Sequence, residues 1–192
     1  LLTGKICIDI GASTGGFTDC MLQNGASKVY AIDVGTNQLD DKLKNNEKVI
    51  NMEQTNIKDV KQEDIGQVDF IGTDVSFISI TQVLPKIYEL LKIKGKAVIL
   101  IKPQFEAGAQ SLNKNGVVKD VKVHKNVILN IVLLANKLGF NILDLDYSPI
   151  KGPAGNIEYL LYMEKNENNF LDSFAIKSAI EDVTTKAFKN LK

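Results

Sequence analysis

Short, continuous apolar runs alternate along this chain with segments of helical periodicity, and this alternation limits the possible fold class. Continuous apolar runs are typical of strands that are buried on both faces, as in a parallel sheet. Pro85 is expected to kink or restart the helical segment that contains it. The predicted strands are 6–10, 29–34, 49–52, 68–74 and 97–101, and the predicted helices are 15–24, 79–92 and 120–138. Alternating strands and helices predict right-handed βαβ units in an open sheet.

The C-terminal part departs from a plain βαβ repeat. Residues 140–147 and 157–163 are predicted strands, and only nine residues rich in proline and glycine separate them. Nine such residues cannot hold a crossover helix, so we expect the two strands to be antiparallel. A mostly parallel seven-stranded sheet with one antiparallel C-terminal strand and helices on both faces resembles the Rossmann-like α/β fold of S-adenosylmethionine-dependent methyltransferases. The tail, residues 165–192, carries a helical apolar stripe that is expected to pack on the sheet.

The length and the charge balance of the chain limit which kinds of domain and partner are possible. The 192 residues suit a single domain, with a core at 1–164 followed by the helical tail. The 23 acidic residues balance 23 basic residues, and every basic residue is a lysine. A nucleic-acid enzyme often carries a basic surplus, because phosphate contacts supply most of the non-specific affinity. Either the acceptor is not nucleic acid, or another segment supplies the contacts with it.

No stretch reaches the roughly 18 apolar residues that a membrane span needs, so no membrane partner is expected. Cys7 and Cys20 lie in a predicted strand and a predicted helix, with no His or Cys nearby in metal-ligand spacing. We interpret both as reduced core thiols, which indicates a cytoplasmic home and no metal site. The chain enters a predicted strand a few residues after Leu1, which indicates a trimmed chain or a further domain upstream.

The segment from Asp9 to Phe17 joins the first predicted strand to the first predicted helix. Glycines there allow the backbone to approach a ligand, and a helix N-terminus offers free N–H groups to an anion. Ser13 stands where a dinucleotide fingerprint has its second glycine, which disfavours pyrophosphate and tolerates the methionine carboxylate of S-adenosylmethionine. The alternative is a plain tight turn. The cofactor candidates of this segment are Asp9, Gly11, Ala12, Ser13, Gly15, Gly16 and Phe17.

Asp33 closes the second predicted strand, where a carboxylate can accept both hydroxyls of an adenosine ribose. Val34 follows it, and Asn56 lies after the third strand, where an adenine edge is expected. The alternative for Asp33 is an ordinary surface carboxylate at a strand end. Asp33 and the glycine-rich segment together are stronger evidence than either alone, because they occupy the two strand ends that a cofactor would contact.

Three charged residues lie at strand ends further along the chain. Asp74 follows the fourth strand, Lys102 follows the fifth, and Glu158 lies early in the antiparallel strand. We expect them to gather at the edge where α/β sheets bind ligands, with Asp74 also contacting the cofactor. A lysine at the end of an apolar strand is costly unless it is paired, and both carboxylates are suitable partners. The alternative is a structural ion network.

Other chemistries fit the residues less well. A cytosine C5 methyltransferase needs a cysteine nucleophile beside the base, and Cys7 and Cys20 lie in the wrong elements. Enzymes that methylate an exocyclic amine carry two prolines after the fourth strand, and the sequence Asp-Val-Ser-Phe at 74–77 has none. His124, the one histidine, is interpreted as a helix-end residue, which argues against a Ser-His or Cys-His mechanism.

On these residues the chain resembles the hemolysin A (TlyA) family of ribosomal RNA methyltransferases, which belong to the FtsJ-like ribose 2′-O-methyltransferases. The resemblance extends from Lys5 to about Lys165. The segments that carry it are DIGASTGGFTD from Asp9, YAIDVGTNQL from Tyr30, TDVSFISIT from Thr73, LIKPQFEAG from Leu100 and GPAGNIEYLL from Gly152.

The resemblance implies that S-adenosylmethionine is the cofactor and that a ribose 2′-OH of ribosomal RNA, in a cytidine, accepts the methyl group. FtsJ-like enzymes use a Lys-Asp-Lys-Glu set, and Asp74, Lys102 and Glu158 match three of its members. The first Lys precedes the first strand in the family, and Lys5 is too close to the strand to replace it. The S4-type RNA-binding domain of the family is absent from this chain, which would explain the neutral charge.

Two rival functions remain open at this point. One is a non-catalytic cofactor-binding or hemolysin-like interaction module, although no amphipathic membrane element is evident. The other is a nucleotide-dependent oxidoreductase, against which Ser13 and the antiparallel end of the sheet argue.

Overall fold

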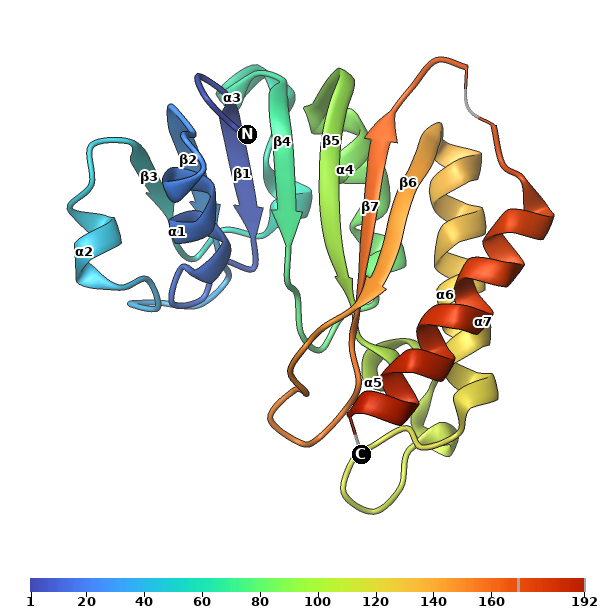
Figure 1. Cartoon of the computed structure of the whole chain (residues 1–192). Helices are drawn as coiled ribbons and strands as arrows, with labels where there is room; N and C mark the ends of the chain where they lie inside the picture. Colours follow the sequence, from blue (N-terminus) through green and yellow to red (C-terminus); the bar gives the residue numbers. More distant parts are fainter. Residues whose placement is uncertain (169, 192) are drawn as a thin grey trace. The chain divides into compact units, whose positions relative to one another are not determined.

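The computed structural model describes residues 1–168 and 170–191, and it contains one mixed seven-stranded sheet. The strands are β1 (Ile6–Ile10), β2 (Lys28–Ile32), β3 (Val49–Met52), β4 (Val68–Thr73), β5 (Leu91–Ile101), β6 (Phe140–Tyr147) and β7 (Tyr159–Lys165). Their order in the sheet is β3-β2-β1-β4-β5-β7-β6 (Figure 1). β1 pairs in parallel with β2 and with β4, and β2 pairs in parallel with β3. β6 and β7 are antiparallel, which confirms the prediction from their short connection.

Helices alternate with the strands, as the periodicity predicts. The α-helices are α1 (Gly16–Gln23), α2 (Asp41–Lys44), α3 (Gln62–Ile65), α4 (Leu84–Leu90), α5 (Pro103–Glu106), α6 (Val121–Leu138) and α7 (Ser173–Asn190). Short 3₁₀ turns are η1 (Ile57–Asp59), η2 (Ile80–Gln82) and η3 (Ala109–Ser111). None of the helices in the described residues is both long and apolar enough to cross a membrane.

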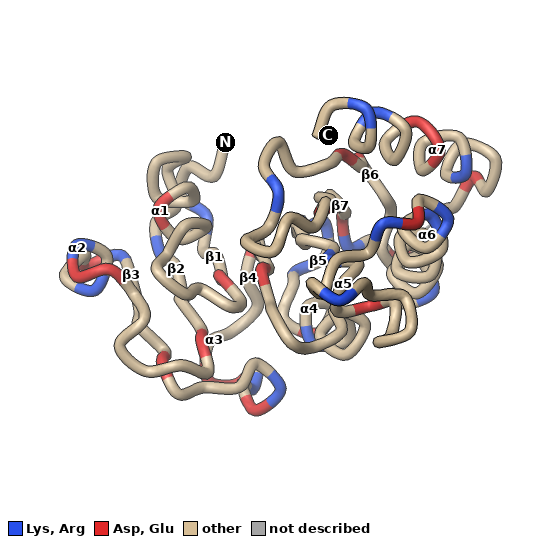
Figure 2. Tube along the Cα trace, turned by 90° about the horizontal axis from the view of Figure 1, so that it is seen from below, with Lys and Arg blue, Asp and Glu red and all other residues tan. Residues whose placement is uncertain are grey.

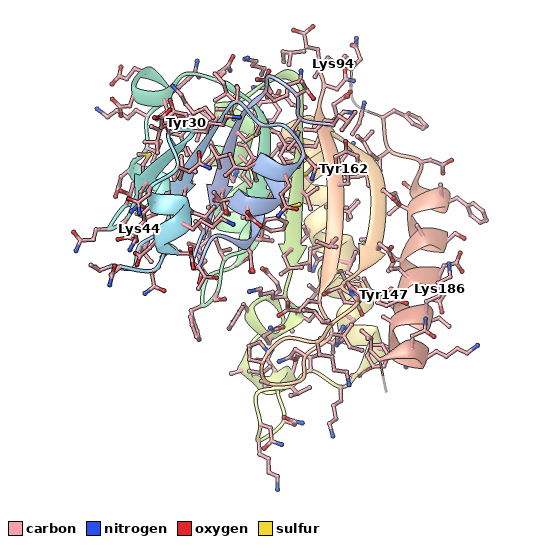
Figure 3. The ribbon with its side chains drawn as sticks, turned by 60° about the vertical axis from the view of Figure 1, so that its left-hand side comes forward. Tyr30, Lys44, Lys94, Tyr147, Tyr162 and Lys186 are labelled. Carbon is pink, nitrogen blue, oxygen red and sulfur yellow. The ribbon has the colours of Figure 1, made fainter. Side chains whose placement is uncertain are left out.

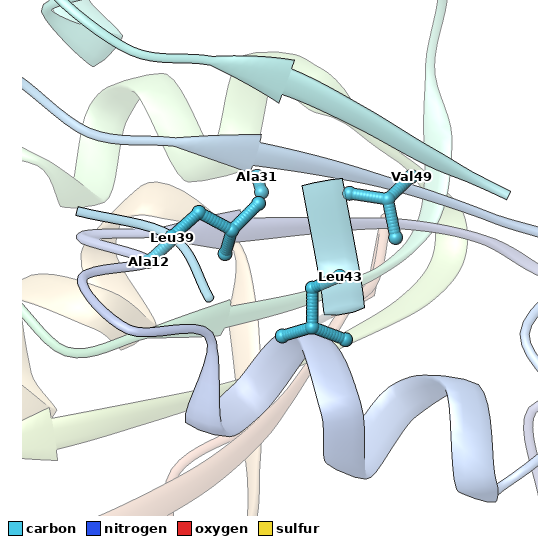
Figure 4. Packing of buried hydrophobic residues seen from close by; sticks show 5 residues of the cluster. All are labelled: Ala12, Ala31, Leu39, Leu43 and Val49. Atoms are coloured by element: carbon cyan, nitrogen blue, oxygen red, sulfur yellow. The ribbon is translucent and has the colours of Figure 1, made fainter. Parts of the chain in front are cut away.

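The chain forms two compact units, of which the first comprises Leu1–Val75 and Val83–Val98. In this unit α1 packs on β1 and β2, and its Met21 joins Cys7 and Val29 in a buried cluster. A second cluster connects the loop after β1 to α2 and β3 (Figure 4). Its buried members are Ala12, Ala31, Leu39, Leu43 and Val49. The loop that follows β1 therefore rests on a fixed apolar base.

The second unit comprises Ser76–Gln82 and the chain from Ile99 onward. Its α6 packs on β6, and α7 packs on both α6 and β6, so the apolar stripe of the tail is buried as predicted. Figure 3 shows Tyr147, at the end of β6, on the side of β6 that faces α7, and the Asn190 amide donates to the Tyr147 hydroxyl at 2.8 Å. Asp120 caps α6 by accepting from the Lys122 backbone N–H, and Gly139 ends the helix at φ 111°.

Two sequence interpretations were wrong in detail. The helix expected over 79–92 is broken into η2 and α4, and β5 begins at Leu91, well before the predicted Ala97. The Cys20 side chain is exposed rather than in the core, because it lies on the solvent side of α1. His124 lies near the start of α6, as predicted for a helix-end residue, and its side chain is fully buried. Its Nε2 bonds the Val118 carbonyl and its Nδ1 bonds the Tyr159 hydroxyl, each at 2.9 Å.

Candidate functional site

The loop that follows β1 has the close backbone approach that its glycines suggest. Gly11 has φ 77°, and a Cβ on it would lie 2.2 Å from the Asp74 carbonyl oxygen. Gly15 has φ 102°, and a Cβ there would collide with the Leu43 and Leu39 side chains. A Cβ on Gly16 would meet nothing within 4 Å. Two of the glycines are therefore required by the packing of this unit, whereas Gly16 faces open space at the start of α1.

Asp9 lies at the end of β1 and is 1% exposed. Its Oδ2 accepts from the Thr18 backbone N–H at 2.8 Å and from the Thr18 hydroxyl at 2.7 Å. Its Oδ1 is buried and has no hydrogen-bond partner among the described residues. Burial raises the pKa of Asp9 to about 6, against the bonds from Thr18, and the charges of Asp74 and Asp33 act in the same direction as burial. Asp9 therefore presents an unsatisfied acceptor within a group of carboxylates.

Asp33 follows β2 and is bonded to the glycine-rich loop. Its Oδ2 accepts from the Ser13 backbone N–H at 2.8 Å, and its Oδ1 accepts from the Gly35 N–H at 2.7 Å. Ser13 itself has φ 48°, which a non-glycine residue rarely adopts. Val34, beside Asp33, is 71% exposed. The two predicted cofactor segments are thus in contact, with a carboxylate and an apolar side chain at their junction.

Glu53, which the sequence analysis did not single out, holds the loop that follows Asp33. Its carboxylate accepts from the backbone N–H groups of Asn37, Gln38 and Leu39 at 2.7, 3.0 and 3.2 Å. These bonds, that of Asn37 foremost, lower the pKa of Glu53. Asn56, a predicted adenine contact, is exposed, and its side chain caps η1 by accepting from the Lys58 N–H.

In the second unit, most side chains of the segment 102–106 contact residues of other segments. The Lys102 ammonium donates to the Ser76 hydroxyl at 3.0 Å. The Gln104 amide donates to Glu158 Oε1 at 2.8 Å, and Glu158 is 7% exposed. A Cβ on Gly152 would lie 2.7 Å from the same Glu158 oxygen. Glu158 is therefore enclosed by Gln104 and by the turn that contains Gly152.

Two further contacts join α5 to the segment 76–82. The rings of Phe77 and Phe105 lie 5.1 Å apart at 51°, although Phe77 is 91% exposed. Glu106 accepts from the Ser79 hydroxyl at 2.6 Å and from the Ile80 N–H at 2.7 Å. Sequence reasoning identified Lys102 and Glu158 but not Ser76, Gln104 or Glu106.

The chemical identity of these partners explains why they were missed. Ser76, Gln104 and Glu106 are common polar residues in loops or short helices, so no spacing rule distinguishes them in a single sequence. The available signal was their adjacency to Lys102 and Asp74. The predicted pairing of Lys102 with Asp74 and Glu158 stays a prediction.

Known proteins resemble this chain over nearly its whole length. A relative from Bacillus subtilis, provisionally named rRNA methyltransferase YqxC, is 44% identical over 194 residues, covering 98% of this chain and 68% of its own. The 16S/23S rRNA (cytidine-2′-O)-methyltransferase TlyA of Mycobacterium tuberculosis is 37% identical over 180 residues, covering 93% and 67% respectively. A solved structure from Streptococcus thermophilus, provisionally described as a hemolysin, is 44% identical with a TM-score of 0.92, covering 98% of this chain and 68% of that one.

The chain thus spans about two thirds of the length of these relatives. The family model described as FtsJ-like methyltransferase matches residues 1–165, which include both the Asp9–Phe17 loop and Glu158. Fold, sequence identity and family model agree, and the chain belongs to the FtsJ-like methyltransferase family.

Proposed function

We propose that this chain transfers the methyl group of S-adenosylmethionine to a ribose 2′-hydroxyl of ribosomal RNA, in a cytidine. The observation that carries the cofactor half of the proposal is the buried, unsatisfied Oδ1 of Asp9 near the charges of Asp33 and Asp74. The name of the Mycobacterium tuberculosis relative supports the acceptor half. An RNA acceptor of this kind also indicates that the protein acts in the cytoplasm.

The carboxylates of the first unit suit a cationic ligand. S-adenosylmethionine carries a sulfonium and an ammonium group, whereas the pyrophosphate of NAD would be repelled by Asp9, Asp33 and Asp74. We assign the ribose hydroxyls of the cofactor to Asp33, whose bonds to Ser13 and Gly35 would rearrange or be shared. We assign the adenine face to the exposed side chain of Val34. The loop residues Gly11, Ala12, Gly15, Gly16 and Phe17 supply the backbone surface for the methionine part, and Asn56 stays a candidate for the adenine edge.

The acceptor is assigned to the surroundings of Lys102. The cofactor supplies an electrophilic methyl group, and the 2′-hydroxyl is a weak nucleophile at neutral pH. A lysine ammonium that already donates to a hydroxyl, that of Ser76, has the geometry to hold a ribose hydroxyl and to stabilise its developing negative charge. Asp74 and Glu158, which match two further members of the family's set, are the other candidate catalytic residues. Much of the rate then comes from approximation of the reacting atoms. The exposed Phe77, packed on Phe105, offers an aromatic face to a base of the RNA.

Calorimetric titration tests the cofactor half. The chain is titrated with S-adenosylmethionine, with S-adenosylhomocysteine and with NAD. We expect saturable binding of the first two only, and loss of at least about tenfold in affinity in Asp33→Ala, because two ribose hydroxyls lose a charged acceptor. Glu47→Ala, which removes an exposed carboxylate from the loop before β3, is the control. Binding of NAD with equal affinity would overturn the assignment.

Transfer of a tritiated methyl group to unmodified ribosomal RNA tests the acceptor half. Lys102→Ala is expected to lower the rate by at least about a hundredfold, because one electrostatic stabiliser of the reacting oxygen is removed. Binding of S-adenosylmethionine should remain within about twofold, since the proposed cofactor residues lie on other elements. Ribonuclease digestion followed by nucleoside analysis identifies 2′-O-methylcytidine. Methyl transfer that survives in Lys102→Ala would exclude the role given to Lys102.

A second candidate function follows from the hemolysin description of the Streptococcus thermophilus relative. Liposome leakage at physiological salt separates the two candidates. Leakage that is caused by this chain and is insensitive to Lys102→Ala would favour membrane damage over methyl transfer.

A further inference from the structure

The segment 76–82 of the second unit contains an unusual backbone conformation next to the proposed acceptor site. Phe77 has φ 63°, in the left-handed region. For a bulky residue this conformation costs on the order of 1–2 kcal/mol, so it persists only where surrounding contacts hold it. Burial of the side chain does not supply that hold, because Phe77 is 91% exposed.

The contacts that hold the segment converge on one carboxylate. Glu106 ends α5, four residues after Lys102, and both of its oxygens are used: Oε2 accepts from the Ser79 hydroxyl at 2.6 Å and Oε1 from the Ile80 N–H at 2.7 Å. These are charge-assisted bonds in a half-buried setting, and such bonds are roughly twice as strong as neutral ones. The Ser79 oxygen also lies 2.6 Å from the Thr81 hydroxyl, so the segment is bonded internally as well.

The other end of the same segment meets the residues assigned to the acceptor. Ser76 accepts from the Lys102 ammonium at 3.0 Å, and the Phe77 ring lies 5.1 Å from that of Phe105. The segment is thus tied to 102–106 at both ends, by Lys102 and Phe105 at one end and by Glu106 at the other. Removal of the Glu106 bonds would release the end of the segment that follows the strained residue Phe77.

We propose that Glu106 is a positioning residue for methyl transfer: its carboxylate holds the strained segment 76–80 so that Ser76 and Phe77 stay beside Lys102 and Phe105. This inference rests on the proposed function, because it concerns how the acceptor side of that reaction is assembled. Glu106 contacts neither reacting group. Its effect is expected on the rate with bound RNA and not on the affinity for S-adenosylmethionine.

Substitutions at Glu106 separate positioning from a general loss of stability. Glu106→Gln keeps the shape, accepts from the Ile80 N–H and can donate to Ser79, whose hydroxyl then donates to Thr81. Glu106→Ala loses both bonds. We expect kcat for RNA methylation to fall at least about tenfold in Glu106→Ala and less than about threefold in Glu106→Gln, because small displacements of reacting groups cost large factors in rate. The affinity for S-adenosylmethionine should stay within about twofold in both.

Glu181→Ala is the matched control. It removes an exposed carboxylate of the same unit, which bonds Lys125 on α6, and should leave kcat unchanged. Assays are run well below the unfolding temperature of each variant. Unchanged kcat in Glu106→Ala would overturn the inference, and so would a loss of S-adenosylmethionine affinity that parallels the loss of kcat.

A fluorescence measurement tests the same inference without methyl transfer. The chain contains no tryptophan, so Phe77→Trp introduces a single reporter at an exposed position. We expect its anisotropy to fall and its quenching by acrylamide to rise when Glu106→Ala is added, and to change little with Glu106→Gln. Identical signals in all three backgrounds would show that Glu106 does not hold the segment. If the unsubstituted chain methylates no RNA, the proposed function fails, and this measurement still decides whether Glu106 holds the segment.

Discussion

Asp9 couples the stability of the first unit to pH. Burial raises its pKa to about 6, above its value of about 3.9 in an unfolded chain. The folded state therefore binds this proton more tightly, so its stabilising contribution is present below about pH 4 and is lost as the pH rises to about 6. A difference of about two pKa units corresponds to about 3 kcal/mol.

Asp9→Asn should remove this pH dependence. An amide does not ionise, and its oxygen can still accept from Thr18. Urea unfolding at intervals between pH 4 and pH 7 should show a smaller decline of the free energy of unfolding in Asp9→Asn than in the unsubstituted chain. Asp182→Asn, which changes an exposed carboxylate on α7, is the control. Equal declines in all three proteins would mean that Asp9 titrates as an ordinary carboxylate.

Single residues of the candidate site were predictable where a strand end fixes their position. Asp9 is near the end of β1, and Asp33 and Asp74 directly follow β2 and β4, so their place at one edge is a consequence of the parallel topology. The residues that hold them were not predictable. Whether Asp33 bonds Ser13, or Glu53 bonds three N–H groups of a neighbouring loop, depends on loop conformations that periodicity does not encode.

At the scale of elements, long helices and strands with strong periodicity were predicted well, and segments of mixed character were not. α6 and β6 have the expected bounds within one residue, because each combines a regular apolar pattern with a clear end signal. The segment 79–92 has helical spacing, but α4 begins only at Leu84, with Pro85 in its first turn, and the lysines at 92, 94 and 96 lie in β5. These lysines alternate with other residues in a strand pattern. The pattern was missed because the predicted helix 79–92 covers the start of β5.

Asn156 joins two loops of the second unit. It is 2% exposed, its Oδ1 accepts from the Val118 N–H at 3.1 Å, and its Nδ2 donates to the Gly116 carbonyl at 3.0 Å. Asn156→Ala leaves both backbone groups without these partners, which should cost about 1–3 kcal/mol for each group that stays buried. Hydrogen exchange of residues 113–118 should become faster, and the free energy of unfolding should fall by about 2 kcal/mol.

Asn115→Ala is the control for this change, because its side chain is exposed on the same loop. The comparison separates the effect of losing the buried Asn156 amide from the general effect of removing an asparagine. If exchange of residues 113–118 is equally fast in the two variants, Asn156 does not fix the loop.

At the scale of the molecule, the net charge is neutral, so only a local concentration of positive charge can attract RNA. The 23 lysines and 23 acidic residues cancel in sum, but not everywhere on the surface. Basic residues occur along the chain between α5 and α6 and along α6 (Figure 2). Lys114 and Lys119 are exposed on the loop that Asn156 holds, and Lys151 is exposed at the turn beside it. None of these three lysines forms an ion pair with any residue that the structure describes, so each can meet a phosphate.

Replacement of these three lysines by glutamine should weaken RNA binding and reduce its dependence on salt. Each phosphate contact contributes about 0.7–0.9 to the slope of log affinity against log salt concentration. Loss of three contacts should therefore lower the slope by about two units, measured by filter binding of ribosomal RNA at several salt concentrations. The matched control replaces the exposed lysines of α7, Lys177, Lys186 and Lys189, by glutamine, which removes the same number of charges. The two variants then have the same net charge. If the salt slope falls only in the first variant, the RNA binds at the loops that Asn156 joins. Equal slopes in the two variants would mean that binding depends on net charge alone.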